Sequence, residues 1–502
     1  MEIDCNRNVF SVLAELATQR PDVEALSFYG ARWTFGDLET AALRIARGLR
    51  ARGVREGDTV GAVLGNTPES VMVCFAAARL GAILVPMSEG ATTHEVEKLV
   101  RAARTDVLVA ATPDPSAAAA AAERLGVRCF VVLDRTAADP LAAVDAVDGG
   151  TDELPAPVPA DRPFVVWFSS GTTGEPKGSV QTHEGFLLNN IGKWIRKVPI
   201  GPDDVSLVFL PLGHTGGGMA WGTILLGGSA KLLAKPSTSE IVESLEKGEG
   251  SYLIGSATIF RMVVRLGRER GLESFPSVRK VIVGAAPVST ELLAELAVAF
   301  PAAEIFQGYG ASEGNISVCS LSETPHKNHT VGVPFPGVEV RLLGADRRPV
   351  PVGEIGEVEI RGPGIIRRYF HQPEPDGEPP WIPLNDLAAF DEDGYLRIAG
   401  RQGDIIISGG FNVMAIEVES VLHQHPAVAA CAVVGRDDER LGEKVVAFVL
   451  PTEGTDADGL EAALGAYCAE RLTRYKVPRE IRVIDTMPRT ALGKIRKHLL
   501  PA

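Results

Sequence analysis

The sequence has no apolar run long enough to cross a bilayer, because no stretch of its 502 residues approaches the ~18 consecutive apolar residues that a spanning helix needs. Cysteine is scarce, with six residues and no Cys-x-x-Cys pair, which predicts reduced thiols and neither a disulfide framework nor a zinc site. The N-terminal segment lacks the apolar core of a signal peptide, and the C-terminal LLPA is no peroxisomal, prenylation or retention signal. Together these absences predict a cytoplasmic protein.

Positive charge is also in deficit. The chain has 50 Lys and Arg against 64 Asp and Glu, a formal net charge of -14. A surface of that sign repels phosphate backbones, so general nucleic-acid binding is disfavoured, although a local basic patch around one small phosphorylated ligand stays possible. With 45% hydrophobic and 23% charged residues, the composition is that of an ordinary globular protein.

Strand and helix periodicities alternate in the first part of the chain. Helical spacing of apolar residues predicts helices at Val9–Arg20, Thr34–Arg52 and Pro68–Leu80, with a strand at Thr59–Leu64. Such alternation favours an α/β fold with a largely parallel sheet. The same rhythm resumes after residue 163.

Other segments have a different character. Gly149–Pro163 is rich in Gly, Pro and acidic residues and reads as a linker. The alanine-rich tract Ala117–Ala122 is expected to be a surface helix that Ser116 caps and Gly126 ends. Short, closely spaced β-prone runs in Gly332–Ile360 suggest antiparallel strands in a barrel-like subdomain, and the last hundred residues read as a compact α+β unit.

The most informative segment is FSSGTTGEPKG, residues 168–178, which follows a predicted strand. Seven of its eleven residues are Ser, Thr or Gly. Small residues let backbone N–H groups approach phosphate oxygens, hydroxyls add donors, and Lys177 adds positive charge. The Walker pattern is absent because Pro176 precedes Lys177, and the GxGxxG fingerprint is absent too, which excludes a nicotinamide dehydrogenase.

This segment resembles the signature of the adenylate-forming superfamily of acyl-CoA synthetases, stand-alone adenylation domains and beetle luciferases. The segments RWTFGDLETAALRIARGL, RLGAILVPM, PLGHTGG, VGAAPVS, QGYGASEG, GRQGDIIISGGFNV and PRTALGKIRK resemble other family motifs in the right order. The resemblance implies a large N-terminal domain (residues 1–402) of stacked α/β subdomains plus a β-barrel-like subdomain. It also implies a small mobile α+β C-terminal domain, residues 403–502.

The resemblance further implies that ATP and a carboxylic acid form an acyl-adenylate, from which the acyl group passes to the thiol of CoA. Lys494 would be the catalytic cation, Glu313 and Thr172 would face Mg²⁺, and His214 would be a catalytic residue lining the tunnel where acyl group and pantetheine meet. The implied nucleotide-binding residues are Ser169, Ser170, Gly171, Thr172, Thr173, Gly174, Lys177, Gly284, Ala285, Ala286, Gln307, Gly308, Tyr309, Gly310, Ser312, Asp386 and Arg401. The implied acyl pocket contains His214, Gly216, Gly217, Gly218 and Gly310, and the glycines suggest room for a bulky, lipophilic acid. The implied CoA path contains Gly409, Gly410, Arg474 and Lys476, within a basic cluster that also includes Arg471 and Arg479.

Three positions depart from the family pattern. Leu384-Asn385 replaces the usual Thr-Gly before Asp386, Gly403 stands at the hinge where Asp or Lys is usual, and Ala415 replaces a common proline. The first two concern ATP handling and domain rotation. One hypothesis is therefore a ligase that mainly performs thioesterification on a pre-made acyl-adenylate.

Several other functions stay open at this point. A stand-alone adenylation enzyme that loads a carrier protein is the main alternative, since it shares the first step. A catalytically silent binding protein is disfavoured because the charged residues Lys177, Glu313, Asp386, Arg401 and Lys494 are all present. Luciferase-like oxidation and amino-acid activation are also less favoured, the latter because Ser251–Ile254 offers no acidic anchor for an ammonium group. A dimer is possible, and the acid substrate is not identified by the sequence.

Overall fold

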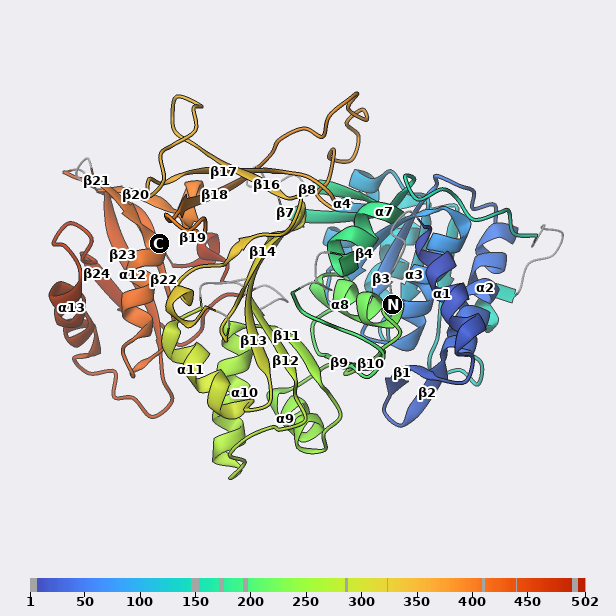
Figure 1. The fold of residues 1–502 in the computed structure, drawn as a ribbon, viewed down its shortest axis with the longest axis horizontal. Coiled ribbons are helices and arrows are strands. Elements are labelled where there is room, and N and C mark those ends of the chain that lie inside the picture. The colour runs from blue at the N-terminus through green and yellow to red at the C-terminus, as the bar shows by residue number, and fades with distance from the viewer. Residues whose placement is uncertain are drawn as a thin grey trace.

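The computed structural model describes residues 7–145, 153–170, 176–192, 197–284, 288–322, 324–408, 411–438, 440–489 and 495–501. Four β-sheets organise this part of the chain, and the C-terminal sheet lies at the opposite end of the molecule from the N-terminal helices (Figure 1). Among the described helices, none is both long and apolar enough to span a membrane.

The first sheet has six strands and is parallel except for its last strand. Its order is β6 (Cys129–Val132), β5 (Val107–Ala111), β3 (Thr59–Leu64), β4 (Ile83–Ser88), β7 (Pro163–Ser170) and β8 (Pro176–Thr182). Helices α4 (Thr93–Ala103) and α5 (Ser116–Leu125) pack on one face, and the short α6 (Ala142–Asp145) contacts β6. Because β7 and β8 pair antiparallel, Ser170 at the carboxyl end of β7 lies beside Pro176 at the start of β8.

The second sheet has nine strands, of which the central six are parallel. Its order is β15 (Val333–Pro334), β14 (Gly314–Ser320), β13 (Glu304–Ala311), β12 (Lys280–Gly284), β11 (Tyr252–Ser256), β9 (Val205–Val208), β10 (Ser229–Leu232), β1 (Glu24–Phe28) and β2 (Ala31–Thr34). Helices α9 (Thr238–Glu246), α10 (Ala257–Glu269) and α11 (Thr290–Ala299) cover one face and bury a separate apolar cluster there.

A layer of helices joins the two sheets through one large core. This layer contains α1 (Val9–Gln19), α2 (Phe35–Ala51), α3 (Pro68–Leu80), α7 (His183–Leu187) and α8 (Thr215–Leu225). Helix α3 is buried along all of its length except Arg79, with Pro68 in its first turn and Gly81 ending it in the left-handed conformation. A helix that is apolar almost all round must be enclosed on every side, and α3 lies inside this core.

A third sheet is antiparallel and follows the second in the chain. Its strands are β16 (Glu339–Leu343), β17 (Gly356–Arg361), β18 (Ile382–Phe390) and β19 (Leu396–Arg401) in that order. The antiparallel strands expected after Gly332 are present, but the described strands form an open four-stranded sheet in which β16 and β19 are the two edges.

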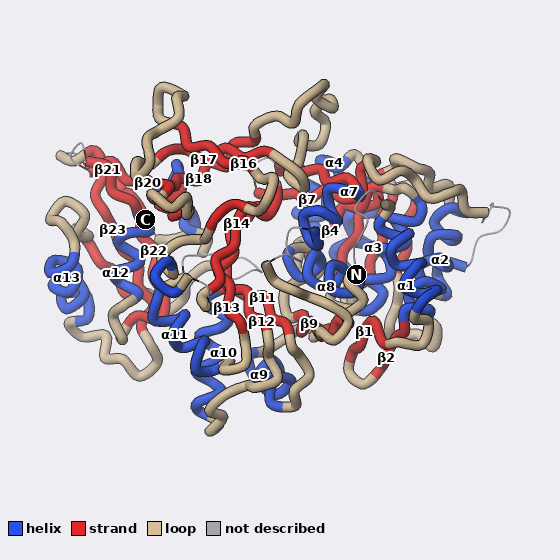
Figure 2. Tube along the Cα trace, viewed as in Figure 1, coloured by secondary structure: helices blue, strands red, loops and turns tan. Residues whose placement is uncertain are grey.

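The C-terminal domain is a compact α+β unit. Its sheet contains β21 (Phe411–Met414), β20 (Ile405–Ser408), β23 (Gly442–Pro451) and β22 (Val428–Asp438), with β24 (Glu480–Val483) beside β23. Helices α12 (Ala415–His423) and α13 (Leu460–Arg471) pack on one face, and the chain end packs on the other. A short 3-10 turn, Gln402–Asp404, which we call the linking turn, connects β19 to β20. Figure 2 shows this helix-and-strand unit at the left end of the molecule, beside β17 and β18.

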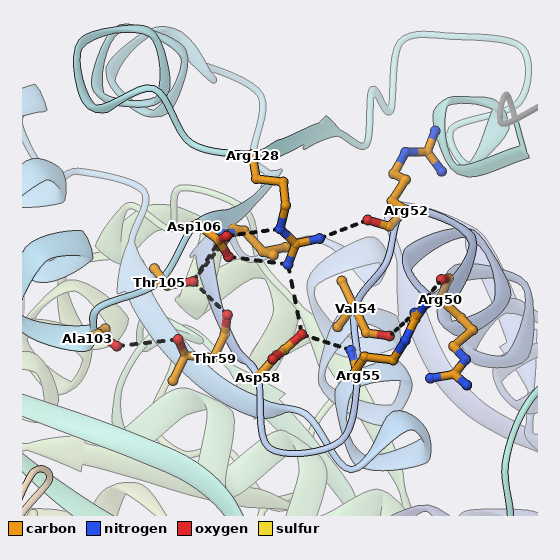
Figure 3. A network of polar contacts seen from close by, with 11 residues as sticks. Arg50, Arg52, Val54, Arg55, Asp58, Thr59, Ala103, Thr105, Asp106 and Arg128 are labelled. Carbon is orange, nitrogen blue, oxygen red and sulfur yellow. Dashed lines mark hydrogen bonds and ion pairs between the residues drawn. The ribbon is translucent and has the colours of Figure 1, made fainter. Parts of the chain in front are cut away.

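A polar network closes the amino-terminal edge of the six-stranded sheet (Figure 3). The Thr105 hydroxyl donates to the carbonyl of Thr59 over 2.6 Å, while the Arg128 guanidinium binds Asp106 at 2.9 Å and the carbonyl of Arg52 at 2.9 Å. These contacts satisfy backbone and charged groups where strands begin. The carboxyl edge of the same sheet is therefore the edge that is available for ligand binding.

The sequence located many elements to within a few residues, and the expectation for Ser116 was wrong. Pro68–Leu80 is a helix and Thr59–Leu64 is a strand, each with the predicted bounds. Ser116 is the first residue of α5 and does not cap it, because its N–H is bound by the Asp114 carboxylate. Gly126 does end α5 in the left-handed conformation, as expected.

Candidate active site

Candidate residues gather at the carboxyl ends of parallel strands in the nine-stranded sheet. Gly284 is the last residue of β12, and the loop after β9 leads to His214. The middle and the end of β13 carry Gln307, Gly308, Tyr309 and Gly310. Carboxyl ends of parallel strands share one edge, where α/β proteins bind ligands. A Cβ on Gly284 would lie 2.7 Å from the carbonyl oxygen of Gly308, so glycine is needed there for the two strands to pair closely.

Nine of the expected site residues lie outside the described residues, and nothing is concluded about them from the structure. They are Gly171, Thr172, Thr173, Gly174, Ala285, Ala286, Gly409, Gly410 and Lys494. Ser169 and Ser170 end β7, but their side chains are not described, and Ser312 lies in the turn between β13 and β14. The backbone of Ser169 pairs with Lys177 on β8.

Lys177, Tyr369 and Glu313 form one side of the site. The Lys177 ammonium lies 5.9 Å from the centre of the Tyr369 ring, and the Tyr369 hydroxyl donates to Glu313 Oε1 over 3.0 Å. Burial and the nearby Glu313 carboxylate raise the pKa of Tyr369, so its hydroxyl is a neutral donor. The contacts bring β8 and the β13–β14 turn to one place.

Sequence reasoning missed Tyr369. Its loop is held against β8 by an isolated bridge between Tyr369 and Ser179 and by a 2.7 Å hydrogen bond from the Phe370 N–H to the Gly178 carbonyl. The sequence signal is weak, because Tyr369 follows two arginines in an irregular segment with no periodicity. Only its long-range pairing with β8 places it in the site.

Tyr309, Asp386 and Arg401 form the other side. Asp386 is 5% exposed and accepts hydrogen bonds from the Tyr309 hydroxyl at 2.7 Å and from Arg401 Nε at 2.8 Å. Asp386 and Arg401 are direct partners on β18 and β19, so the antiparallel register fixes their pairing. Burial and the adjacent Asp386 raise the pKa of Tyr309. Glu313 lies in the turn directly after β13, the strand that carries Tyr309, so the two sides of the site are next to each other.

The unusual residues before Asp386 have a structural explanation. Asn385 has φ 59°, in the left-handed region where the family pattern has glycine, and asparagine is among the few other residues that adopt it readily. Leu384 is 8% exposed and belongs to the main core. The added bulk therefore points to the core and leaves Asp386 in its ion pair.

The residues present suit a nucleotide and a divalent cation. Gln307 Oε1 is buried without a hydrogen-bond partner among the described residues, so a ligand with an amino group would satisfy it. Among the described residues, no cluster of three His, Cys, Asp or Glu could hold a metal ion by itself. A single carboxylate such as that of Glu313 fits Mg²⁺, which proteins commonly bind through one or two carboxylates together with substrate phosphates.

The glycines that follow His214 have a packing role. His214 is half-buried and precedes α8, and Gly216 and Gly217 lie in the first turn of that helix. A Cβ on Gly216 would lie 2.1 Å from the Leu210 carbonyl oxygen, and one on Gly217 would lie 2.3 Å from that of Leu212. Close approach of α8 to the preceding loop explains these glycines without a wide pocket, while a Cβ on Gly218 would meet the Asn190 side chain at 2.8 Å.

The expected CoA residues and the expected hinge lie in the C-terminal part. Arg474 is exposed, whereas the Lys476 ammonium already binds Glu417 on α12 at 2.6 Å. Gly403 is the middle residue of the linking turn, and a Cβ there would meet nothing within 4 Å. Neither space nor a positive φ requires glycine at this position.

Comparison with known proteins agrees with this geometry. The model of the AMP-binding enzyme family matches residues 13–370, and that of the AMP-binding enzyme C-terminal domain matches residues 417–494. A feruloyl-CoA synthase from Amycolatopsis sp is 32% identical over 98% of each chain.

Solved structures share the whole architecture. An anthranilate CoA ligase, AuaEII, in complex with anthranoyl-AMP is 25% identical with a TM-score of 0.88 over 99% of this chain and 98% of that one. ATP-bound MatB from Rhodopseudomonas palustris is 27% identical with a TM-score of 0.85, against 0.76 for the apo form of the same enzyme, each over 98% of both chains. The chain belongs to the AMP-binding enzyme family, and it is an AMP-forming acid–thiol ligase that uses ATP and CoA.

Proposed function

We propose that this acyl-CoA ligase activates a bulky, lipophilic carboxylic acid, and that aromatic acids are its substrates. The similar proteins whose names specify feruloyl and anthranoyl groups support an aromatic acyl group. The observation that carries the assignment of the site is the adjacency of the Lys177–Tyr369–Glu313 contacts to the Tyr309–Asp386–Arg401 contacts at the end of β13.

Asp386 would bind the ribose of ATP. A carboxylate has about four acceptor sites, and the two hydrogen bonds from Tyr309 and Arg401 leave capacity for sugar hydroxyls. Apart from the contact of its Nε with Asp386, the Arg401 side chain is exposed, so its remaining N–H groups can reach a phosphate. The unpartnered Gln307 oxygen would accept from the adenine amino group.

Lys177, Glu313 and Lys494 would handle the phosphates. The two reacting anions repel, so positive charge must be held between them while the carboxylate attacks the α-phosphate and pyrophosphate leaves. Lys177 and Lys494 would supply the cations, and Glu313, oriented by Tyr369, would hold Mg²⁺ together with Thr172. The metal, when bound, neutralises phosphate charge.

The acceptor step would follow rotation of the C-terminal domain about Gly403, with residues 1–402 as the fixed domain and 403–502 as the moving one. The higher TM-score to ATP-bound than to apo MatB supports a domain arrangement like that of the ATP-bound enzyme. Gly409 and Gly410 would leave space for pantetheine, and His214 would stand where it meets the acyl group. Arg474 would contact CoA phosphates, as would Lys476 after release from Glu417.

Two alternatives keep a specific test. An enzyme that transfers the acyl group to a carrier protein instead of CoA would use the same adenylation residues. The hypothesis of a ligase that mainly performs thioesterification loses much of its basis, because Asn385 adopts a left-handed conformation that glycine also adopts readily. The five described cysteines are free and buried, which supports the reducing cytoplasm as the location of the protein. Light scattering would test whether the protein is a dimer.

The test is to incubate the protein with ATP, Mg²⁺, CoA and a pooled set of cinnamic, benzoic, indolic and fatty acids, and to measure acyl-adenylates and thioesters by mass spectrometry. We expect an aromatic acyl-CoA. A fatty acyl-CoA alone would contradict the substrate class, and adenylate without thioester would move the assignment to a carrier-protein acceptor. Lys494→Ala should abolish adenylate formation from ATP while nucleotide binding persists.

A further inference from the structure

The chain on both sides of residues 490–494 is anchored to the C-terminal domain. Arg489 and Ile495 form an antiparallel bridge, and the Arg496 N–H donates to the Pro488 carbonyl over 2.8 Å. After this bridge, Leu500 is 5% exposed in a small apolar cluster on the sheet face opposite α12 and α13. The two ends of this segment are therefore close together and fixed.

Lys497 links this anchored tail to the linking turn. Its ammonium lies 3.0 Å from Asp404 Oδ2 and 2.9 Å from Glu419 Oε1 on α12. The three side chains are largely covered, with exposed fractions of 25%, 40% and 17% for Lys497, Asp404 and Glu419. Burial opposes the charge of Lys497, but Glu419 and Asp404 outweigh it and raise its pKa, so the ammonium persists at neutral pH.

The linking turn is held from its other side by the N-terminal domain. The side-chain amide of Gln402, two residues before Asp404, donates a hydrogen bond to the Glu357 carboxylate on β17. Gly403, with open space around it, lies between these two attachments. The turn is thus bound to the large domain at one end and to the tail at the other.

We propose that Lys497 is a positioning residue that ties the tail carrying Lys494 to the linking turn, and so sets where Lys494 stands when ATP and the acid react. This inference rests on the proposed role of Lys494, three residues earlier in the chain. Without the ammonium, Asp404 and Glu419 are left as two neighbouring carboxylates with no shared cation, and they repel. The tail and the linking turn then move apart.

The experiment separates the two half-reactions. In Lys497→Met, adenylate formation from ATP and acid falls by about 10- to 100-fold, the loss that follows misplacement of a reacting group by about 1 Å. Thioester formation from synthetic acyl-adenylate and CoA stays within about twofold, because that step does not need Lys494. Lys497→Arg restores adenylation, since a guanidinium can bridge both carboxylates.

Lys444→Met is the matched control. Lys444 binds Glu480 at 2.7 Å in the same domain, with both side chains 31% exposed, but neither belongs to the tail or the linking turn. This variant should leave both half-reactions unchanged. Asp404→Asn removes only the contact to the linking turn and should lower adenylation less than Lys497→Met, so it tests the inference even if Lys497→Met folds poorly.

An equal loss of both half-reactions in Lys497→Met and Asp404→Asn, with a lower Tm, would reduce Lys497 to a stabilising residue. Unchanged adenylation in Lys497→Met, alongside loss in Lys494→Ala, would overturn this inference alone. Retained adenylation in Lys494→Ala would instead refute the proposed function of Lys494, on which the inference depends.

Discussion

The Tyr369 hydroxyl donates a hydrogen bond to Glu313 Oε1 over 3.0 Å, although the two residues are 56 positions apart in the chain. This contact connects a loop paired with β8 to the turn between β13 and β14. A carboxylate that faces Mg²⁺ has to be held in one orientation, and a neutral tyrosine hydroxyl does this without adding charge. Tyr369 is thus a candidate for orienting the metal-facing carboxylate.

Removing the Tyr369 hydroxyl should therefore weaken adenylation. A hydrogen bond to a charged group contributes about 1.5–3 kcal/mol, so Tyr369→Phe should lower kcat/KM for adenylation by about 10- to 100-fold. It should also raise the Mg²⁺ concentration needed for half-maximal rate. Pyrophosphate release measured across an Mg²⁺ series tests both effects.

Tyr29→Phe is the control for that variant, because the Tyr29 hydroxyl also binds a glutamate, Glu240. Tyr29 is 58% exposed and lies in the turn between β1 and β2. It should leave the Mg²⁺ dependence unchanged. If Tyr369→Phe behaves like Tyr29→Phe, the Glu313 carboxylate does not depend on this contact.

Asn385 should be replaceable by glycine but not by alanine. At φ 59° a Cβ-bearing residue without a polar side chain costs about 1–2 kcal/mol, so Asn385→Ala should lower the free energy of unfolding by that amount. Asn385→Gly should stay close to the parent in stability and adenylation, and Leu384→Thr/Asn385→Gly should adenylate at the parent rate. Denaturant unfolding and pyrophosphate release measure these quantities. A large gain in adenylation for the double variant would revive the thioesterification hypothesis.

Asp386 should account for recognition of the ribose. We expect the parent to prefer ATP over 2′-deoxy-ATP or 3′-deoxy-ATP by about 10- to 100-fold, as for a lost hydrogen bond to a carboxylate. In Asp386→Asn that preference should largely disappear, together with a rise in KM for ATP. Adenylation rates with the three nucleotides test the coupling. If the variant kept the full preference, Asp386 would not contact the sugar.

Buried His183 should make the protein less stable in mild acid. Burial lowers its pKa to about 3, and the Val9 N–H donates to its Nδ1 at 3.3 Å. Since the unfolded chain has a histidine pKa of about 6.5, it binds more protons than the folded protein between about pH 6.5 and 3. The stabilisation is complete above pH 6.5 and is lost as the pH falls below it.

Between pH 7.5 and 5.5 this loss amounts to about 1.4 kcal/mol. His183→Gln should show a pH dependence that is smaller by that amount, whereas exposed His326→Gln should match the parent. Denaturant unfolding at both pH values measures the difference. Identical slopes for parent and His183→Gln would show that His183 is not the group responsible.

The elements that sequence alone located well are those with local signals. Pro68–Leu80 combines a proline in its first turn with a terminal glycine, and Thr34 begins a helix with a capping box to Asp37. The strand that carries Asp386, Ile382–Phe390, was not predicted, because its polar residues interrupt the alternation and its bulge shifts the register. The family motif identified Asp386 where periodicity did not.

Long-range contacts explain what else sequence reasoning could not supply. Tyr369 has no local pattern and gains its position from pairing with Ser179. Gly216 and Gly217 were interpreted as space for substrate, yet the carbonyls of Leu210 and Leu212 occupy the places where their Cβ atoms would stand. Whether a glycine packs against backbone or lines a pocket depends on its neighbours in the fold. The amino-acid composition does not specify those neighbours.

The pairing of β1 with β10 has a consequence for how the protein is made. Leu26 lies beside Ala230 in this parallel pair, so the partner of an N-terminal strand is about 200 residues away in the chain. At roughly 5–20 residues per second of synthesis, β1 and its hairpin partner β2 wait about 10–40 s on the ribosome before that edge is covered. Slow codons placed before residue 230 would lengthen this exposure, and a chaperone that shields the nascent N-terminus should raise the yield of folded enzyme.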